Sequence, residues 1–327
     1  MTSRRILPVL ALAAASAVVL AGCASTDAGA DDGRISIVAS TNVYGQIAQE
    51  VGGDLVDVSA IVSSAAQDPH SFEASARDQL SVNRADLIIE NGAGYDAFMD
   101  ALIESSAADA PVITAAELSP EWPADDHGDD AEHDDHADDD HGHDDHDHIE
   151  GFNEHVWYDP ATMGALATEI AHELGELDPD NAATFEANAA TFQSGIDGLA
   201  AALAKVEASA GGAGVFVTEP APVYLLLAAG LTDLTPPAFS ESVEQGQDVP
   251  PATLLAALDL LRSGDVDVLI ANAQTGGAET TQVIDEAETQ KIPVLEFTET
   301  LPDGETYLQW MQQNIDALTT ALAQPAP

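Results

Sequence analysis

From residue 35 to the C-terminus, short runs rich in β-branched residues alternate with stretches of helical periodicity. The strand-like runs are residues 35–38, 56–62, 86–90 and 111–114 in the first half, and 215–217, 267–270 and 292–297 in the second. The helical stretches are residues 43–51, 95–103, 161–177, 223–229, 254–261, 281–288 and a final one from 307. This alternation is typical of βαβ units, in which helices cover a parallel sheet. It predicts an α/β fold with two lobes built on mostly parallel sheets.

Between the two halves the apolar residues follow a different spacing. They recur every three or four positions at Phe185, Ala189, Phe192, Ile196, Leu199, Leu203 and Val206. Such spacing places them on one face of a single helix. A helix over residues 181–209 would be about 43 Å long at 1.5 Å per residue, long enough to join two lobes. We therefore expect an N-terminal lobe over 33–180, a linking helix over 181–210 and a C-terminal lobe over 211–327.

The net charge of the chain limits the kinds of molecule that it can be expected to bind. The 327 residues include 58 Asp and Glu against 8 Lys and Arg, which gives a formal net charge of -50. Such an acidic chain is not expected to bind nucleic acid or anionic membrane surfaces. The 45% hydrophobic content is enough for real cores, so the chain as a whole is not expected to be disordered. A single cysteine excludes an internal disulfide and a cysteine-rich zinc site.

The N-terminus has the pattern of an export signal. Two arginines, Arg4 and Arg5, precede an apolar run over residues 6–20, which is too short to span a bilayer comfortably. The run ends in Leu-Ala-Gly-Cys at residues 20–23, which resembles the lipobox of bacterial lipoproteins. We expect a signal peptide over 1–22, a lipid on Cys23, a flexible tether over 23–32 and an extracytoplasmic location. A plain signal peptide with an incidental cysteine is the alternative, and the export route, Sec or twin-arginine, stays open.

One internal segment has no residue that could form a core. Residues 125–148 contain 13 acidic residues and 7 histidines, within a surface loop expected over 124–150. Its histidines are His127, His133, His136, His141, His143, His146 and His148. Interleaved imidazoles favour auxiliary metal binding, because neutral histidine is the commonest ligand of borderline metals. The alternative is a low-complexity expansion without a task.

Three histidines lie outside this loop. His172 lies in a helical pattern among glutamates, which indicates a surface position. His70 follows the strand-like run 56–62, at the carboxyl end where open α/β sheets place ligands. His155 follows the acidic loop beside aromatic residues, and a hydrogen-bonded core histidine is its simplest interpretation.

The short sequence strings around His70 and His155 are more informative together than singly. Asp-Pro-His-Ser-Phe-Glu at 68–73 and His-Val-Trp-Tyr-Asp-Pro at 155–160, with a His/Asp-rich insertion before the second, resemble the zinc and manganese solute-binding lipoproteins of bacterial ABC importers. Further similar strings are residues 40–43, 85–94 and 307–311. The resemblance covers essentially the whole mature chain. Each string is weak by itself, and their order and spacing carry the similarity.

The resemblance implies a metal held in a cleft between the lobes. His70 and His155 match the two N-lobe ligands, and Glu219, after the strand-like run 215–217, matches the third. Glu219 also fits a plain carboxylate at a helix N-terminus. The fourth ligand is usually a carboxylate, and Asn272 stands at the expected place. Because a neutral amide is a poor zinc ligand, Asn272, Gln274, a neighbouring carboxylate or water remain the alternatives.

Two imidazoles and a carboxylate suit Zn(II), with Mn(II) or Fe(II) as alternatives. We expect a lipid-anchored, monomeric receptor that captures Zn(II) and delivers it to the membrane permease of an ABC importer. No enzymatic activity is expected. The rival functions are a zinc hydrolase, for which the sequence offers no HExxH motif, and a surface metal buffer or adhesin that works through the His-rich loop.

Overall fold

The computed structural model describes residues 33–64, 66–107, 109–123, 149 and 151–323. The expected signal peptide, Cys23 and all seven histidines of the 125–148 segment lie outside these residues. The described residues from Arg34 onward form one compact unit, which contains both lobes.

The first lobe is built on a four-stranded parallel sheet with the order β2-β1-β3-β4. Its strands are β1 (Ile35–Thr41), β2 (Val56–Val62), β3 (Leu87–Glu90) and β4 (Val112–Thr114). The central strands are largely buried on both faces because helices cover the sheet. All four residues of β3 are buried, for example.

The second lobe repeats this topology. Its sheet is also parallel and four-stranded, with the order β6-β5-β7-β8. The strands are β5 (Gly214–Val217), β6 (Thr232–Asp233), β7 (Val268–Asn272) and β8 (Val294–Phe297). In both lobes the second strand therefore lies at one edge of the sheet, and the third and fourth strands lie on the other side of the first strand. Ligand sites in such sheets lie at the carboxyl ends of the strands.

The helices follow the strands as βαβ units require. They are α1 (Asn42–Gly52), α2 (Ala76–Val82), α3 (Ala97–Glu104), α4 (Pro160–Leu177), α5 (Ala182–Ala210), α6 (Val223–Ala228), α7 (Pro237–Glu244), α8 (Pro251–Ser263), α9 (Ala278–Gln290) and α10 (Tyr307–Leu322). No helix among the described residues is both long and apolar enough to cross a membrane.

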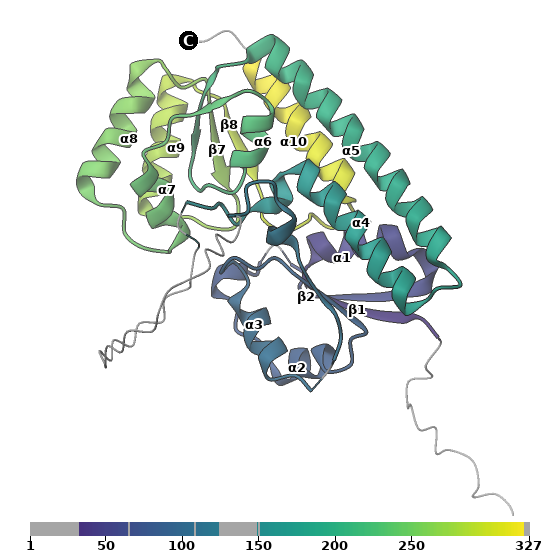
Figure 1. Cartoon of the computed structure of the whole chain (residues 1–327). Helices are drawn as coiled ribbons and strands as arrows, with labels where there is room; N and C mark the ends of the chain where they lie inside the picture. The colour runs from purple at the N-terminus through teal and green to yellow at the C-terminus, as the bar shows by residue number, and fades with distance from the viewer. Residues whose placement is uncertain (1–32, 65, 108, 124–148, 150, 324–327) are drawn as a thin grey trace, which may run out of the picture. The chain divides into compact units, whose positions relative to one another are not determined.

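The long helix α5 confirms the periodicity seen in the sequence. Its seven stripe residues, Phe185 to Val206, are all buried. It packs against α4 and α1 of the first lobe and against α6 and α10 of the second (Figure 1). The apolar cluster that includes this stripe also includes buried residues of both sheets, so α5 joins the two lobes through a continuous core.

Hydrogen bonds also join the lobes directly. Asn42 at the start of α1 exchanges two bonds with the backbone of Leu301, at 2.8 and 2.9 Å. The Tyr158 hydroxyl donates to the carbonyl of Thr298 at 2.6 Å. These bonds hold the segment after β8 against the first lobe.

The structure adds local detail that the sequence patterns did not predict. Strand β1 extends to Thr41, three residues beyond the predicted end. The two-residue strand β6 and the helix α7 were not predicted. Helix α2 begins at Ala76, because Ser75 caps it in a capping box with Asp78.

Candidate metal centre

The structure brings His70 and His155 together, with ring centroids 5.7 Å apart. His70 lies in a single 3₁₀ turn after β2, where Asp68 accepts hydrogen bonds from the His70 backbone N–H at 3.0 Å and the Ser71 hydroxyl at 2.8 Å. His155 precedes the turn Val156–Tyr158 and is fully buried. Of the three histidines outside the acidic loop only these two meet, because His172 lies exposed on α4 as expected.

Asn153 determines which nitrogen of His155 can bind a metal. Its Oδ1 accepts from the His155 backbone N–H at 3.1 Å, and its Nδ2 donates to the Pro220 carbonyl at 3.0 Å. These two bonds fix the orientation of the amide, so Oδ1 also faces His155 Nδ1 at 2.7 Å as an acceptor. Nδ1 must then carry the proton, which leaves the lone pair of the neutral ring on Nε2. Histidine ligands of metals are commonly oriented by such a bond.

Aromatic side chains enclose the histidine pair. Tyr95 packs edge-on against both rings, with centroid distances of 4.8 Å to His70 and 5.8 Å to His155. Trp157 packs against His155 at 5.1 Å. This packing buries the ring of His155 and leaves one side of His70 open.

Three residues at the carboxyl ends of the second sheet face the histidines. Glu219 follows β5, Asn272 ends β7 and Glu299 follows β8 by two residues. Asn272 Nδ2 donates to both carboxylates, to Glu219 and, at 2.5 Å, to Glu299. Glu219 also accepts from the Thr275 hydroxyl. Glu299 Oε2 lies 3.6 Å from His70 Nε2 and accepts from the Tyr95 hydroxyl at 3.1 Å.

The amide of Asn272 therefore acts as a hydrogen-bond donor to the two carboxylates, whereas the sequence predicts a metal ligand at this position. Its Oδ1 accepts from the Gln274 backbone N–H at 3.0 Å, which turns the NH₂ group toward the carboxylates. A fully donating NH₂ has no lone pair for a metal. Glu299 places a carboxylate near His70, and a neighbouring carboxylate is one of the alternatives that the sequence left open for the fourth ligand. Gln274 is occupied elsewhere, because its Oε1 accepts from the backbone N–H groups of Glu299 and Thr300 at 2.7 and 3.0 Å.

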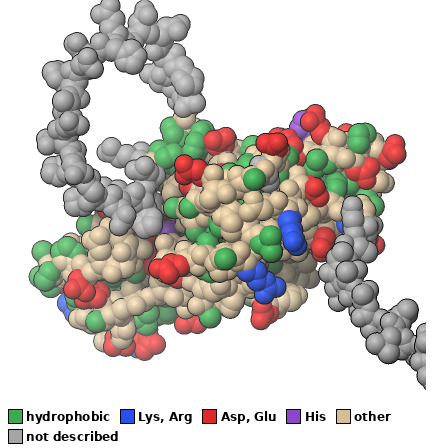
Figure 2. Space-filling view, turned by 90° about the horizontal axis from the view of Figure 1, so that it is seen from below, with side chains coloured by type: hydrophobic (Ala, Val, Ile, Leu, Met, Phe, Trp, Pro, Cys, Tyr) green, Lys and Arg blue, Asp and Glu red, His purple; other side chains and the backbone are tan. Residues whose placement is uncertain are grey.

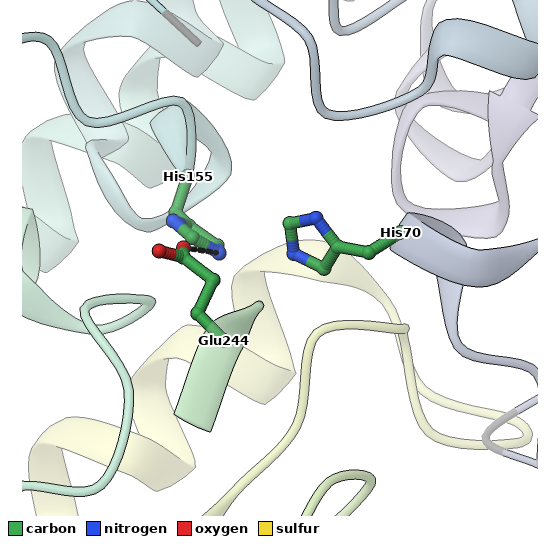
Figure 3. A group of neighbouring side chains, drawn as sticks. All are labelled: His70, His155 and Glu244. Atoms are coloured by element: carbon green, nitrogen blue, oxygen red, sulfur yellow. Dashed lines mark ion pairs between the residues drawn. The ribbon is translucent and has the colours of Figure 1, made fainter. Parts of the chain in front are cut away.

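Glu244, the last residue of α7, approaches the site from the second lobe. Its Oε1 lies 3.5 Å from His155 Nε2 (Figure 3). One donor atom each from His70, His155 and Glu244 lie within 4.8 Å of one another. Tetrahedral zinc ligands at about 2.1 Å would lie roughly 3.4 Å apart, so a modest contraction would bring these atoms to ligand distances.

Burial makes the carboxylates of the site costly to ionise without a cation. It raises the pKa of Glu219 to about 7, helped by the neighbouring charge of Glu299. Burial likewise raises the pKa of Glu299 to about 7, although the hydrogen bond from Asn272 opposes the shift. The pKa of Glu244 is raised by burial and by the charges of Glu154, Glu219 and Glu299. Such a cluster gains free energy from a divalent cation, which removes the repulsion.

A cavity of about 770 Å³ leads to this cluster. Its walls are Asp68, His70 and Ser71 from the first lobe and residues 243–249 and 274–280 from the second. Glu219, Glu299 and His155 do not line it. His70 and Glu244 thus face the cavity, and the other acidic ligand candidates lie deeper.

The sequence named neither Glu299 nor Glu244, although a neighbouring carboxylate was one alternative for the fourth ligand. Glu299 follows a predicted strand at its carboxyl end, so the signal was present, but Asn272 follows another such strand and was preferred. Glu244 lies on a helix that the sequence pattern did not predict.

Comparisons with known proteins identify relatives of the whole chain. The family model described as "Zinc-uptake complex component A periplasmic" matches residues 37–321. The manganese ABC transporter substrate-binding lipoprotein ScaA of Streptococcus gordonii is 25% identical, over 94% of this chain and 96% of its own length. The zinc-binding lipoprotein AdcA of Streptococcus pneumoniae is 26% identical over 97% of this chain, which spans only 61% of AdcA.

The fold also has solved counterparts. The solute-binding protein FpvC of Pseudomonas aeruginosa, in complex with Mn²⁺, aligns with a TM-score of 0.67 at 23% identity, over 88% of this chain and 98% of that one. At this identity the match establishes the fold, two α/β lobes joined by a long helix.

Proposed function

Because this chain belongs to the zinc-uptake complex component A family, we propose that it captures Zn(II) between its lobes and delivers the ion to the permease of an ABC importer. The ligands are His70 and His155 from the first lobe and Glu219 and Glu299 from the second. Asn272 holds the two carboxylates in place as a hydrogen-bond donor, and the metal is cargo in this function.

The convergence of two imidazoles with two buried carboxylates across the lobes carries the proposal. Neutral His70 and His155 with ionised Glu219 and Glu299 give the ligand set a charge of -2, which a divalent cation cancels. A monovalent ion or a neutral solute would leave charge in a site where Glu299 is 1% exposed. Burial is the main cause of the raised pKa values of both glutamates, because it disfavours a carboxylate charge that no cation balances.

Zinc is favoured by the ligand types. Two nitrogen and two oxygen donors complete a tetrahedral zinc shell, and zinc binds such a set more tightly than manganese does. Mn(II), or Fe(II), is the alternative, and the relatives named above include both a manganese and a zinc lipoprotein.

The remaining parts of the proposal rest on sequence. Lipid on Cys23 would anchor a monomeric receptor outside the cytoplasm, and the histidines of residues 125–148 would hold further ions weakly. The charge of the surface suits a cation receptor: acidic side chains are scattered over the face in Figure 2, with a few Lys and Arg among them.

The rival functions make different demands on the protein. A hydrolase requires turnover, whereas the names of the two relatives describe a substrate-binding lipoprotein of an ABC transporter and a zinc-binding lipoprotein. A surface buffer or adhesin requires the 125–148 segment, whereas the proposed site lies wholly in the two lobes.

Metal binding by the purified full-length chain tests the proposal. We expect one tightly bound Zn(II) in competition with a chromophoric chelator, and at least a hundredfold weaker binding in His155→Ala. The matched control is His172→Ala, because His172 is exposed on α4 and its substitution removes an imidazole outside the site. Equal zinc affinity of the wild type and His155→Ala would overturn the proposal.

A further inference from the structure

Glu244 is a carboxylate that the proposed ligand set does not use. Its side chain is 10% exposed, and it extends from the end of α7 toward the His155 ring (Figure 3). Among the described residues no donor makes a hydrogen bond to its Oε1. A buried carboxylate oxygen normally accepts one or more such bonds.

The contact between Glu244 and His155 is between two acceptors. Asn153 keeps the proton of the neutral ring on Nδ1, so Nε2 presents a lone pair to Glu244 Oε1 at 3.5 Å. Two lone pairs at this distance repel unless a proton or a metal ion lies between them. Nε2 is also the atom that would bind the metal, so Glu244 points at the place the ion would occupy.

Glu244 also lies on the route from solvent. The 770 Å³ cavity is lined by Glu244 and His70, whereas Glu219 and Glu299 lie behind them. An ion that enters through this cavity meets Glu244 and His70 before it reaches the deeper carboxylates. The three donors His70, His155 and Glu244 are already grouped within 4.8 Å.

A tetrahedral metal ion cannot bind Glu244 and the two deep carboxylates at the same time. His70, His155, Glu219 and Glu299 fill the four positions of a tetrahedral zinc ion. A third carboxylate would exceed that number and leave the buried cluster with a net charge of -1. Glu244 and the deep pair must therefore alternate at the metal.

We propose that Glu244 is the arrival ligand of the metal, binding it first with His70 and His155 before the deep carboxylates replace it. This inference rests on the proposed function. In the exchange, the bond between the metal and Glu244 Oε1 breaks, bonds to Glu219 and Glu299 form, and water from the cavity side leaves the metal. Release follows the same steps in reverse, so Glu244 lowers the barrier in both directions and contributes little to the final affinity.

Stopped-flow kinetics on the full-length chain tests this. Binding is followed with Co(II) through quenching of tryptophan fluorescence, since the Trp157 ring lies 5.1 Å from the His155 ring. Release is followed as transfer of Zn(II) to excess chromophoric chelator. The variants are Glu244→Gln, Glu244→Asp, and the control Glu241→Gln, which removes a charge from an exposed position on the same helix.

We expect Glu244→Gln to slow binding and release at least tenfold each, with the equilibrium affinity within threefold of the wild type. Glu241→Gln should stay within twofold in both rates, and Glu244→Asp, which keeps a shorter carboxylate, should be intermediate. Rates of Glu244→Gln equal to those of Glu241→Gln would overturn the proposal. Weaker affinity with faster release would also overturn it, because Glu244 would then be a permanent ligand. A wild type without a tight zinc site would instead overturn the proposed function.

Discussion

Glu299→Gln gives the sharpest test of the charge balance in the site. The substitution keeps the shape of the side chain and removes one negative charge from a position that is 1% exposed. With Zn(II) bound, the ligand set of the wild type is neutral, whereas the variant carries a net charge of +1. Uncompensated charge in a desolvated site is expensive, so metal affinity should fall.

The expected size follows from two opposing terms. At 4 Å and an effective dielectric constant near 20, a unit charge attracts a divalent ion by about 8 kcal/mol. Against this, the metal-free protein must release any proton on Glu299, whose pKa rises from 4.5 to about 7, but at pH 7.5 this costs only about 0.2 kcal/mol. The amide oxygen that the substitution introduces is a weaker ligand and recovers part of the remainder. We therefore expect a loss of at least about 2.7 kcal/mol, or a hundredfold in Kd.

The assay is chelator competition with Zn(II) at pH 7.5. The matched control is Glu296→Gln, three residues earlier on β8, because Glu296 is exposed and its charge faces solvent. Asn272→Ala should lose less than Glu299→Gln, since it removes two hydrogen bonds but leaves both carboxylates charged. The charge argument would be refuted if Glu299→Gln bound zinc within a few-fold of the wild type, or if Glu296→Gln weakened binding equally.

Three further predictions concern other parts of the chain. Burial, with the nearby charge of Asp96, raises the pKa of Glu90 to about 7. Between about pH 4.5 and 7 the native state therefore holds a proton that the unfolded state has lost. Because of this difference, the free energy of unfolding falls as the pH rises toward 7. In urea unfolding, Glu90→Gln should therefore be more stable than the metal-free wild type at pH 8, by on the order of 2 kcal/mol. Near pH 4.5 the two proteins should be equally stable. The same difference in stability at both pH values would contradict this prediction. Deletion of residues 125–148 should lower zinc stoichiometry in calorimetry and leave the tightest affinity unchanged, and loss of the tight site would contradict the two-lobe location. Cys23→Ser should move the protein from the membrane to the soluble extracytoplasmic fraction, because each acyl chain contributes about 0.8 kcal/mol per buried CH₂; equal retention in detergent-free fractionation would disprove the anchor.

The sequence by itself determined the features that depend on neighbours along the chain. The apolar stripe of α5 follows from a spacing of three and four residues, and every one of its seven members is buried. Apart from β6, the strands of the two sheets follow from short β-branched runs, which the structure confirms to within a few residues. His70 and His155 were singled out because the short strings around them resemble those of a metal-binding family; one string follows β2 and the other precedes α4, which Asp159 caps.

Only the tertiary structure decided which residues of the second lobe meet those histidines. Strands β5, β7 and β8 each lead into a polar side chain, and the sequence does not say how their carboxyl ends are placed against the first lobe. Hydrogen-bond geometry then separates Asn272, whose NH₂ faces the carboxylates, from Glu299, whose carboxylate faces His70. Glu244 comes from a helix without a clear sequence signal and reaches His155 across 89 positions of the chain. The periodicity of apolar residues indicates the local backbone conformation, over one or two helical turns or a short strand. A metal site depends instead on the directions of side chains from distant segments, which only the packing of the two lobes brings together.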